Sequence, residues 1–264
     1  MSLPVQAYFV CGGRWHDFDF ARVEILKLLA EHPGVRTRVA EDFSDIQALS
    51  ESDFLITYTC DLENVSAAQE AALENFVVSG KRWFALHGTN SVFEFLEKGS
   101  VKAVRSHDVV MRTLGSHFLA HPPIEPYTVE NAAPDHPLVC GVESFEATDE
   151  LYLCRYFGEI EPLLQTRFSG QAKGFVDADW SDDDPRLVMY LHPHGAGEVL
   201  YLTLGHCRGA YDMRPRVDVY PTVERCAWEL PVFHELLRRG LRWAIGGLDA
   251  VDADPNQSLE GESA

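Results

Sequence analysis

The sequence has few basic residues and no long apolar run. Lysine and arginine number 22 of 264 residues, against 41 aspartates and glutamates, which gives a net charge of −19 at pH 7. Such a surface repels nucleic-acid phosphates and anionic membranes, so we exclude nucleic acids and membrane surfaces as partners. No stretch approaches the ~20 apolar residues of a membrane-spanning helix. Residues 1–6 lack the basic start of a secretion signal.

Cysteine pairs and the common nucleotide and hydrolase motifs are also missing. The six cysteines include no CxxC pair, so we expect free thiols in a reducing, cytoplasmic environment. No GxxxxGK[ST], GxSxG or HExxH motif is present, which leaves nucleotide-binding and serine-hydrolase functions without support. Cys207 next to His206 is not a catalytic dyad, because adjacent side chains of a strand point to opposite faces.

The first third of the sequence alternates between apolar runs and helical periodicity. We predict strands at residues 7–11, 35–40, 54–58 and 83–86, with helices at residues 19–30 and 67–78. Strands that are apolar on both faces and alternate with helices are typical of a parallel sheet covered on both sides. The sequence therefore predicts an α/β fold with a mostly parallel central sheet.

The second half is less regular. We predict a helix at residues 104–120, strands at residues 151–157, 161–168, 187–191 and 198–204, and a helix at residues 233–245. Residues 249–264 are acidic and poor in apolar side chains, as in disordered segments. We therefore expect a single domain over residues 1–248 and a disordered tail over residues 249–264.

Histidines directly follow several of the predicted strands. His16, His87 and His206 each come after such a strand, beside glycines that a turn would require. In an open parallel sheet, ligands bind beyond the carboxyl ends of the strands. A turn does not require histidine, and imidazole can act as acid, base or metal ligand. We therefore predict a ligand crevice at these three positions.

The individual residues also have simpler explanations. His87, followed by Gly88, has the position of a strand-to-helix elbow that presents a reactive side chain. The alternative is that its ring has no role beyond hydrogen bonds to the backbone of the turn. His117 and His121 would share one helix face and suit a divalent metal, or both could be solvated. Glu150 could supply a catalytic carboxylate or lie on the surface.

Six short segments of the sequence resemble segments that occur in the same order in the ThuA-like (trehalose utilisation) family. They are ALHG at 85–88, LGSHF at 114–118 followed by His121, DHPL at 135–138, DELY at 149–152, the strand at 197–204 leading to His206, and the helix at 236–243. The resemblance spans residues 5–246. It implies a flavodoxin-like, class I glutamine amidotransferase-like three-layer sandwich with a mostly parallel central sheet.

The resemblance also bears on activity. Amidotransferases of this fold have a cysteine at the elbow and a histidine after a late strand, whereas here His87 stands at the elbow and His206 at the partner position. Without an elbow thiolate the acyl-enzyme route is missing, so we expect no glutaminase activity. The family is associated with catabolism of trehalose and related disaccharides, alongside oxidoreductases that make 3-keto sugars. His16 and His121 match family histidines, whereas Ser116-His117 departs from the usual pattern.

We therefore predict an enzyme, a hydrolase, lyase or isomerase, that acts on a sugar or 3-keto sugar by acid–base or metal-assisted chemistry. The predicted catalytic residues are His87, His206 and Glu150. The predicted substrate-binding residues are Trp15, His16, Asn90, His121 and Tyr211. His87, His121 and His206 are the candidate ligands of a divalent metal, zinc or manganese. The alternative is a non-catalytic sugar- or metabolite-binding module with a degenerate amidotransferase site, and a homo-oligomer is compatible with either.

Overall fold

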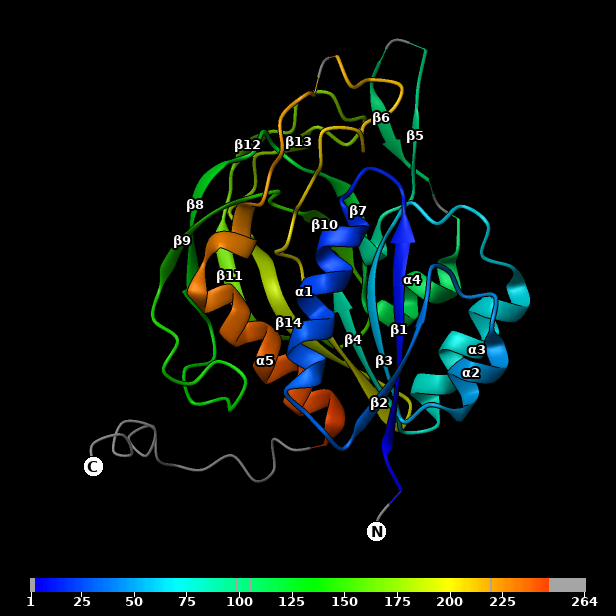
Figure 1. Cartoon of the computed structure of the whole chain (residues 1–264). Helices are drawn as coiled ribbons and strands as arrows, with labels where there is room; N and C mark the ends of the chain where they lie inside the picture. The colour runs from blue at the N-terminus through cyan, green and yellow to red at the C-terminus, as the bar shows by residue number, and fades with distance from the viewer. Residues whose placement is uncertain (1–2, 98, 105, 219, 247–264) are drawn as a thin grey trace, which may run out of the picture.

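The computed structural model describes residues 3–97, 99–104, 106–218 and 220–246, and the predicted tail at 249–264 lies outside them. Within these ranges a nine-stranded sheet forms the centre of the molecule (Figure 1), in the order β2-β1-β3-β4-β15-β14-β11-β8-β9. Its strands are β1 (Val5–Gly13), β2 (Val35–Ala40), β3 (Phe54–Cys60), β4 (Arg82–Leu86), β8 (Glu125–Asn131), β9 (Phe145–Asp149), β11 (Glu161–Arg167), β14 (Pro185–His194) and β15 (Gly197–Leu202).

The two halves of the sheet differ in strand direction. From β2 to β15 every neighbouring pair is parallel, in the 2-1-3-4 order that flavodoxin-like sheets use. From β15 to β9 every neighbouring pair is antiparallel. The fold is therefore mixed α/β, and the expectation of a mostly parallel sheet is correct for the first half only.

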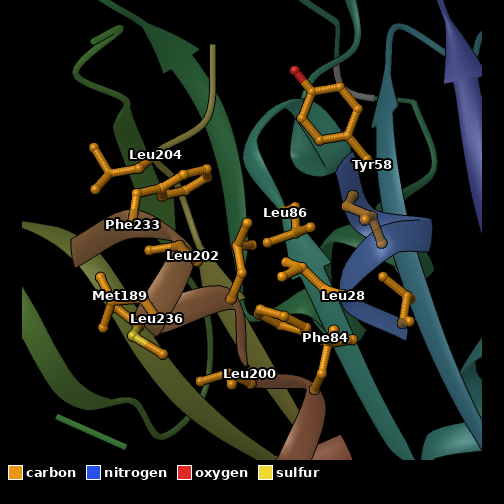
Figure 2. Close-up of a cluster of buried hydrophobic side chains, with 14 of the residues drawn as sticks. Leu28, Tyr58, Phe84, Leu86, Met189, Leu200, Leu202, Leu204, Phe233 and Leu236 are labelled. Atoms are coloured by element: carbon orange, nitrogen blue, oxygen red, sulfur yellow. The ribbon is translucent and has the colours of Figure 1, made fainter. Parts of the chain in front are cut away.

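Helices cover both faces of the parallel half. Helices α1 (Phe18–Ala30) and α5 (Pro231–Ile245) lie on one face, and α2 (Ile46–Glu51), α3 (Ala67–Val78) and α4 (Asp108–Leu114) lie on the other. Figure 2 shows the first of these two cores, in which Phe84 and Leu200 of the sheet face Leu28 of α1 and Leu236 of α5. No helix of the described residues is long and apolar enough to span a membrane.

Short elements lie beyond the carboxyl ends of the parallel strands (Figure 1). They are the pairs β5 (Phe93–Phe95) with β6 (Val101–Ala103), β7 (Ser116–Ala120) with β10 (Leu153–Tyr156), and β12 (Gly170–Gln171) with β13 (Asp179–Trp180), and the 3-10 helices η1 (His87–Asn90) and η2 (Cys226–Glu229). These insertions surround the sheet edge at which the sequence predicts a ligand site.

The helix predicted over residues 104–120 is observed only over Asp108–Leu114. Helix α4 ends at Gly115, whose φ of 78° lies in the left-handed region, where glycine terminates helices at little cost. The chain then continues as strand β7. His117 lies on this strand and is buried, so His117 and His121 do not share a helix face.

The contact between α5 and β4 can be tested at Gly240. A Cβ at this position would overlap the ring of Phe84, and forced overpacking costs about 1–3 kcal/mol. This cost exceeds the ~0.5–1 kcal/mol that alanine gains over glycine inside a helix. We therefore expect Gly240→Ala to lower the free energy of unfolding measured in urea.

Gly34→Ala is the matched control. No heavy atom lies within 4 Å of a Cβ built on Gly34, so we expect a change within about 0.5 kcal/mol. Equal unfolding free energies for the two variants would contradict the described packing of α5 on β4.

Candidate functional site

Three histidines from separate strand ends meet at the carboxyl edge of the sheet. His16 follows β1, His87 begins η1 directly after β4, and His206 follows β15. All three side chains are buried. His16 Nε2 lies 2.9 Å from His87 Nε2 and 3.3 Å from His206 Nδ1. The structure thus brings together the three histidines that the strand pattern singles out.

Glu150 completes this group from the antiparallel half of the sheet. It follows the last residue of β9, and its side chain is 11% exposed. Glu150 Oε2 lies 3.5 Å from His87 Nε2, and Oε1 lies 3.3 Å from His206 Nδ1. One ligand atom from each of His16, His87, Glu150 and His206 lies within 4.8 Å of the other three. We call these four residues the histidine–glutamate cluster.

The ring nitrogens of His87 and His16 that point away from the cluster face backbone carbonyls. His87 Nδ1 lies 2.8 Å from the carbonyl oxygen of Thr203. His16 Nδ1 lies 3.4 Å from the carbonyl oxygen of Arg14. A carbonyl only accepts, so these contacts favour the Nδ1–H tautomers. In that form each Nε2 directs a lone pair into the cluster.

His206 has a carboxylate in the corresponding place. Its Nε2 lies 2.8 Å from Glu224 Oε2, and Arg208 donates to the other oxygen of Glu224 at 2.5 Å. The His206 side chain is 1% exposed. Glu224 therefore holds the outer edge of the ring, while Nδ1 faces His16 and Glu150.

Burial and neighbouring charges give the cluster unequal proton affinities. Burial, together with the neighbouring His87 and His206, holds the pKa of His16 well below its ordinary value. Burial opposes the charged form of His206 too, but the charge of Glu150 and hydrogen bonds to Glu150 and Glu224 outweigh it and raise the pKa to about 10. In the absence of a metal ion, His16 is therefore neutral at pH 7, whereas His206 is protonated and positively charged.

The pKa values of the two carboxylates, Glu150 and Glu224, are both lowered. Burial alone would raise the pKa of Glu150, but the charges of His206 and His121 hold it well below its ordinary value. The pKa of Glu224 is lowered for a similar reason, since its bond to His206 outweighs its burial. Both carboxylates therefore remain ionised at neutral pH and face the protonated ring of His206.

The cluster lies at a pocket with aromatic walls and a volume of about 270 Å³. This volume is slightly below the roughly 300–1,000 Å³ that is typical of ligand pockets. The aromatic lining residues are Trp15, Phe93, Phe95, Phe118, Tyr152, Phe175 and Tyr220. His16, Glu150 and His206 line the same pocket, and His87 reaches it only through its contacts with His16 and Glu150. A small ligand can therefore approach the cluster.

His87 has the backbone of a strained elbow. Its φ is 43°, in the left-handed region that non-glycine residues rarely adopt. Its carbonyl accepts a 2.6 Å hydrogen bond from the hydroxyl of Tyr201. The next residue, Gly88, has no room for a side chain, because a Cβ there would lie 2.7 Å from Cys60 Cβ. Such strain is typical of functional positions and agrees with the elbow expected at His87.

Two predicted substrate-binding residues line the pocket. Trp15 has a φ of 79° and donates from Nε1 to Asp61 at 2.7 Å, which fixes its ring at the pocket wall. His121 Nδ1 lies 2.8 Å from the carbonyl oxygen of Pro122, and Nε2 lies 3.7 Å from Glu150 Oε1. His121 thus stands beside the cluster but is not one of its four members. The metal set expected from sequence, His87, His121 and His206, stays a prediction, and the four side chains that meet here include His16 and Glu150 instead of His121.

Asn90 and Tyr211 are not among the residues that line the pocket. Asn90 is fully buried, and its side chain donates to Ser116 Oγ at 2.6 Å, so it fastens η1 to β7. Tyr211 is 69% exposed, and its ring packs under the guanidinium of Arg214. Their predicted role in substrate binding therefore stays a prediction that the lining of this pocket does not support.

Sequence reasoning missed Glu224 and the role of Asp149. Glu224 lies 18 residues beyond His206, in a segment without a motif, so nothing links the two in the sequence. Asp149 accepts hydrogen bonds from the backbone N–H groups of Gly205, His206 and Ala227 at 3.0–3.1 Å. This carboxylate joins the end of β9 to the loop that holds His206.

Comparison with known proteins points to one family, by sequence and by structure. A family model described as "ThuA: Trehalose utilisation" matches residues 10–219. ThuA-like proteins from Bacteroides uniformis and Parabacteroides merdae superpose with TM-scores of 0.62 and 0.60 at 18% and 15% identity, covering 92% of this chain in each case and 93% and 91% of theirs. A protein named as a GMP synthase subunit from Thermoplasma acidophilum gives 0.50 at 10% identity, over 94% and 96% of the two chains. No curated protein matches.

The anchoring role of Asp149 predicts a specific loss of stability. In Asp149→Asn an amide NH₂ group replaces one accepting oxygen and faces backbone donors. Leaving buried donors unsatisfied costs about 1–3 kcal/mol, and we expect that loss in the free energy of unfolding measured in urea.

Glu146→Gln is the matched control, because Glu146 lies on the same strand with an exposed side chain. We expect it to change stability by no more than about 0.5 kcal/mol. If both variants unfold at the same urea concentration as the unmodified protein, Asp149 does not anchor this loop.

Proposed function

The chain belongs to the ThuA family, described as trehalose utilisation, and from this premise we propose that it is an enzyme acting on a small sugar. Family membership supports a role related to trehalose utilisation. The finer proposal is that the substrate is a 3-keto derivative of trehalose or of a related disaccharide. The reaction is cleavage, elimination or isomerisation at the histidine–glutamate cluster.

One observation carries the proposal: a buried, charged cluster forms part of the lining of a small pocket with aromatic walls. Aromatic rings provide flat apolar surfaces, which suit the C–H faces of a pyranose. Polar groups at one end of such a pocket fix the orientation of the ligand. A sugar ring held between Trp15 and Phe175 would direct its polar groups toward His16, Glu150 and His206.

A 3-keto sugar suits this arrangement because its carbonyl acidifies the neighbouring C–H. In the proposed reaction a base removes the proton at C2, a C1=C2 double bond forms as the bond from C1 to the glycosidic oxygen breaks, and that oxygen takes up a proton. His121 is the best-placed base, since it lines the pocket, its Nδ1 faces the Pro122 carbonyl, and its Nε2, 3.7 Å from Glu150 Oε1, is the atom that would accept the proton. The imidazoles of the cluster, His87 and above all the protonated His206 at the pocket wall, would stabilise the negative charge that develops on the carbonyl oxygen.

Glutamine hydrolysis is not part of the proposal. On a three-layer amidotransferase-like sandwich, which we propose as the finer description of the fold, the elbow would hold a cysteine thiolate, and here it holds His87. Burial raises the pKa of the nearby Cys60 well above its ordinary value and that of Cys207 to about 12. Neither thiol is poised as a nucleophile at pH 7.

The cellular setting and the partners are proposed on simpler grounds. All six cysteines are unpaired, as in proteins of reducing compartments, so we propose that the enzyme acts in the cytoplasm. Its proposed partner is the sugar substrate, and the expected homo-oligomer stays a prediction.

Turnover of 3-ketotrehalose tests the proposal. We expect His121→Ala to lower kcat/KM by about 10²–10⁴-fold, the usual contribution of a general acid or base, and His206→Ala to lower it at least as much. His32→Ala is the control, because His32 lies beyond the end of α1 and does not line the pocket. The assay follows the release of free glucose.

Two results would count against the proposal. Unchanged kcat/KM in both His121→Ala and His206→Ala would mean that the chemistry lies elsewhere. Calorimetric binding of sugars without turnover of any keto sugar would instead support the alternative, a binding module on a degenerate amidotransferase fold.

A further inference from the structure

We propose that His16, His87, Glu150 and His206 form a divalent transition-metal centre, with Glu224 as the residue that positions His206. The inference concerns the cluster itself and holds whether or not the substrate is a sugar. It differs from the metal set expected from the sequence, because His121 is outside it and His16 and Glu150 are inside it.

The first argument comes from the proton positions on His87 and His16. His87 Nδ1 faces the Thr203 carbonyl at 2.8 Å and His16 Nδ1 faces the Arg14 carbonyl at 3.4 Å. Both Nδ1 atoms are therefore donors, and both Nε2 atoms carry inward lone pairs in the neutral rings. Yet these two Nε2 atoms lie only 2.9 Å apart. Two lone pairs at that distance repel unless a cation lies between or beside them.

A single proton cannot satisfy the whole cluster. A proton on one nitrogen would bridge one pair of atoms, but His206 Nδ1 and the two oxygens of Glu150 also point inward, at 3.3–3.5 Å from their nearest cluster partners. A metal ion accepts a lone pair from each of the four residues at once, which removes the conflict.

The separations also fit a coordination sphere. Zinc binds imidazole nitrogen at about 2.0–2.1 Å and carboxylate oxygen at about 2.0–2.2 Å, so the donors of a tetrahedral site lie roughly 3.3–3.5 Å apart. Four of the donor-to-donor distances here are 2.9, 3.3, 3.3 and 3.5 Å, where Glu150 contributes a different oxygen to each of its two distances. One donor atom from each residue lies within 4.8 Å of the other three. Side-chain shifts that separate the Nε2 atoms of His16 and His87 and bring the wider pairs closer together would place all four donors around one ion.

The outer contacts are those of metal-binding histidines. Histidines that ligate metals almost always donate their second N–H to a carboxylate, a carbonyl or water, which fixes the tautomer and the ring orientation. His206 has the Glu224 carboxylate, held in turn by Arg208, and His87 has the Thr203 carbonyl. Glu224 thus completes a carboxylate–histidine–metal arrangement.

The donor set indicates the kind of metal. Three imidazoles and one carboxylate suit zinc and also iron or manganese, and do not suit calcium or magnesium, which prefer oxygen ligands alone. His16, Glu150 and His206 line the pocket, so a ligand entering the pocket reaches the ion. We commit to zinc as the best fit, because its tetrahedral geometry needs only these four donors.

Metal binding by the purified full chain tests the inference without any activity assay. The protein is prepared without a histidine tag, stripped with a chelator, dialysed and titrated with Zn²⁺ or Co²⁺ alone. We expect one ion per chain by elemental analysis and intense visible absorption from the Co²⁺ form, as four- or five-coordinate cobalt gives. His16→Ala should abolish both signals in a protein whose circular dichroism is unchanged.

Two further variants separate the proposed ligand set from its rivals. Glu224→Gln should lower Zn²⁺ affinity by about 10–100-fold, the usual effect of losing an outer carboxylate, while keeping one ion per chain. His121→Ala should leave Zn²⁺ affinity unchanged, because His121 lies outside the set.

Three outcomes would overturn the inference: less than about a tenth of an ion per chain after reconstitution of a folded protein, unchanged affinity in Glu224→Gln, or loss of binding in His121→Ala. Failure here is distinct from failure of the proposed function. Keto-sugar turnover by a protein that binds no metal would remove the metal centre alone, whereas metal binding without turnover of any sugar would remove the proposed function alone.

Discussion

The carboxylate of Asp149 is the contact on which the candidate site depends. It accepts backbone hydrogen bonds from Gly205, His206 and Ala227, and thereby joins β9, at one edge of the sheet, to the loop that follows β15. Because Glu150 is the next residue, the same contact sets the carboxylate of Glu150 against the His206 ring. The parallel half of the sheet supplies the three imidazoles, and the antiparallel half supplies the Glu150 carboxylate that faces them.

Burying these polar groups is costly unless each has hydrogen-bond partners. Each of the three rings has such a partner on the side that points away from the cluster. Carbonyls of Arg14 and Thr203 face two of the rings, and Glu224 faces the third. The inner nitrogens and Glu150 face one another, and the Tyr152 hydroxyl lies 3.3 Å from His87 Nε2 as a further contact. This division of the donor and acceptor groups makes the cluster a candidate reactive centre rather than an ordinary group of buried histidines.

The sequence predicts the parallel half of the fold and part of the site, for a physical reason. Strands buried on both faces produce continuous apolar runs, which identify β1, β3 and β4, and the polar residues after these runs include His16 and His87. Helix α3 at Ala67–Val78 is predicted with its observed bounds. The family resemblance is confirmed by the match over residues 10–219. The loop histidine His206 is identified because β15 is also an apolar run.

The remainder depends on contacts that local patterns do not encode. Strands β8 and β9 have partly exposed faces and give no clear signal. Gly115 ends a helix that periodicity alone would continue. Glu224 reaches His206 only through the path of a long loop, and Asn90 and Tyr211 are assigned to the pocket from their proximity in sequence to His87 and His206. Tertiary packing decides all of these positions.

The most direct test of the central claim is a crystal structure of the zinc-reconstituted protein with diffraction data collected above and below the zinc absorption edge. Our account predicts one strong anomalous peak that disappears below the edge, bounded by His16 Nε2, His87 Nε2, His206 Nδ1 and a Glu150 oxygen. Density that shows these rings in direct contact, with no anomalous peak between them, would contradict it.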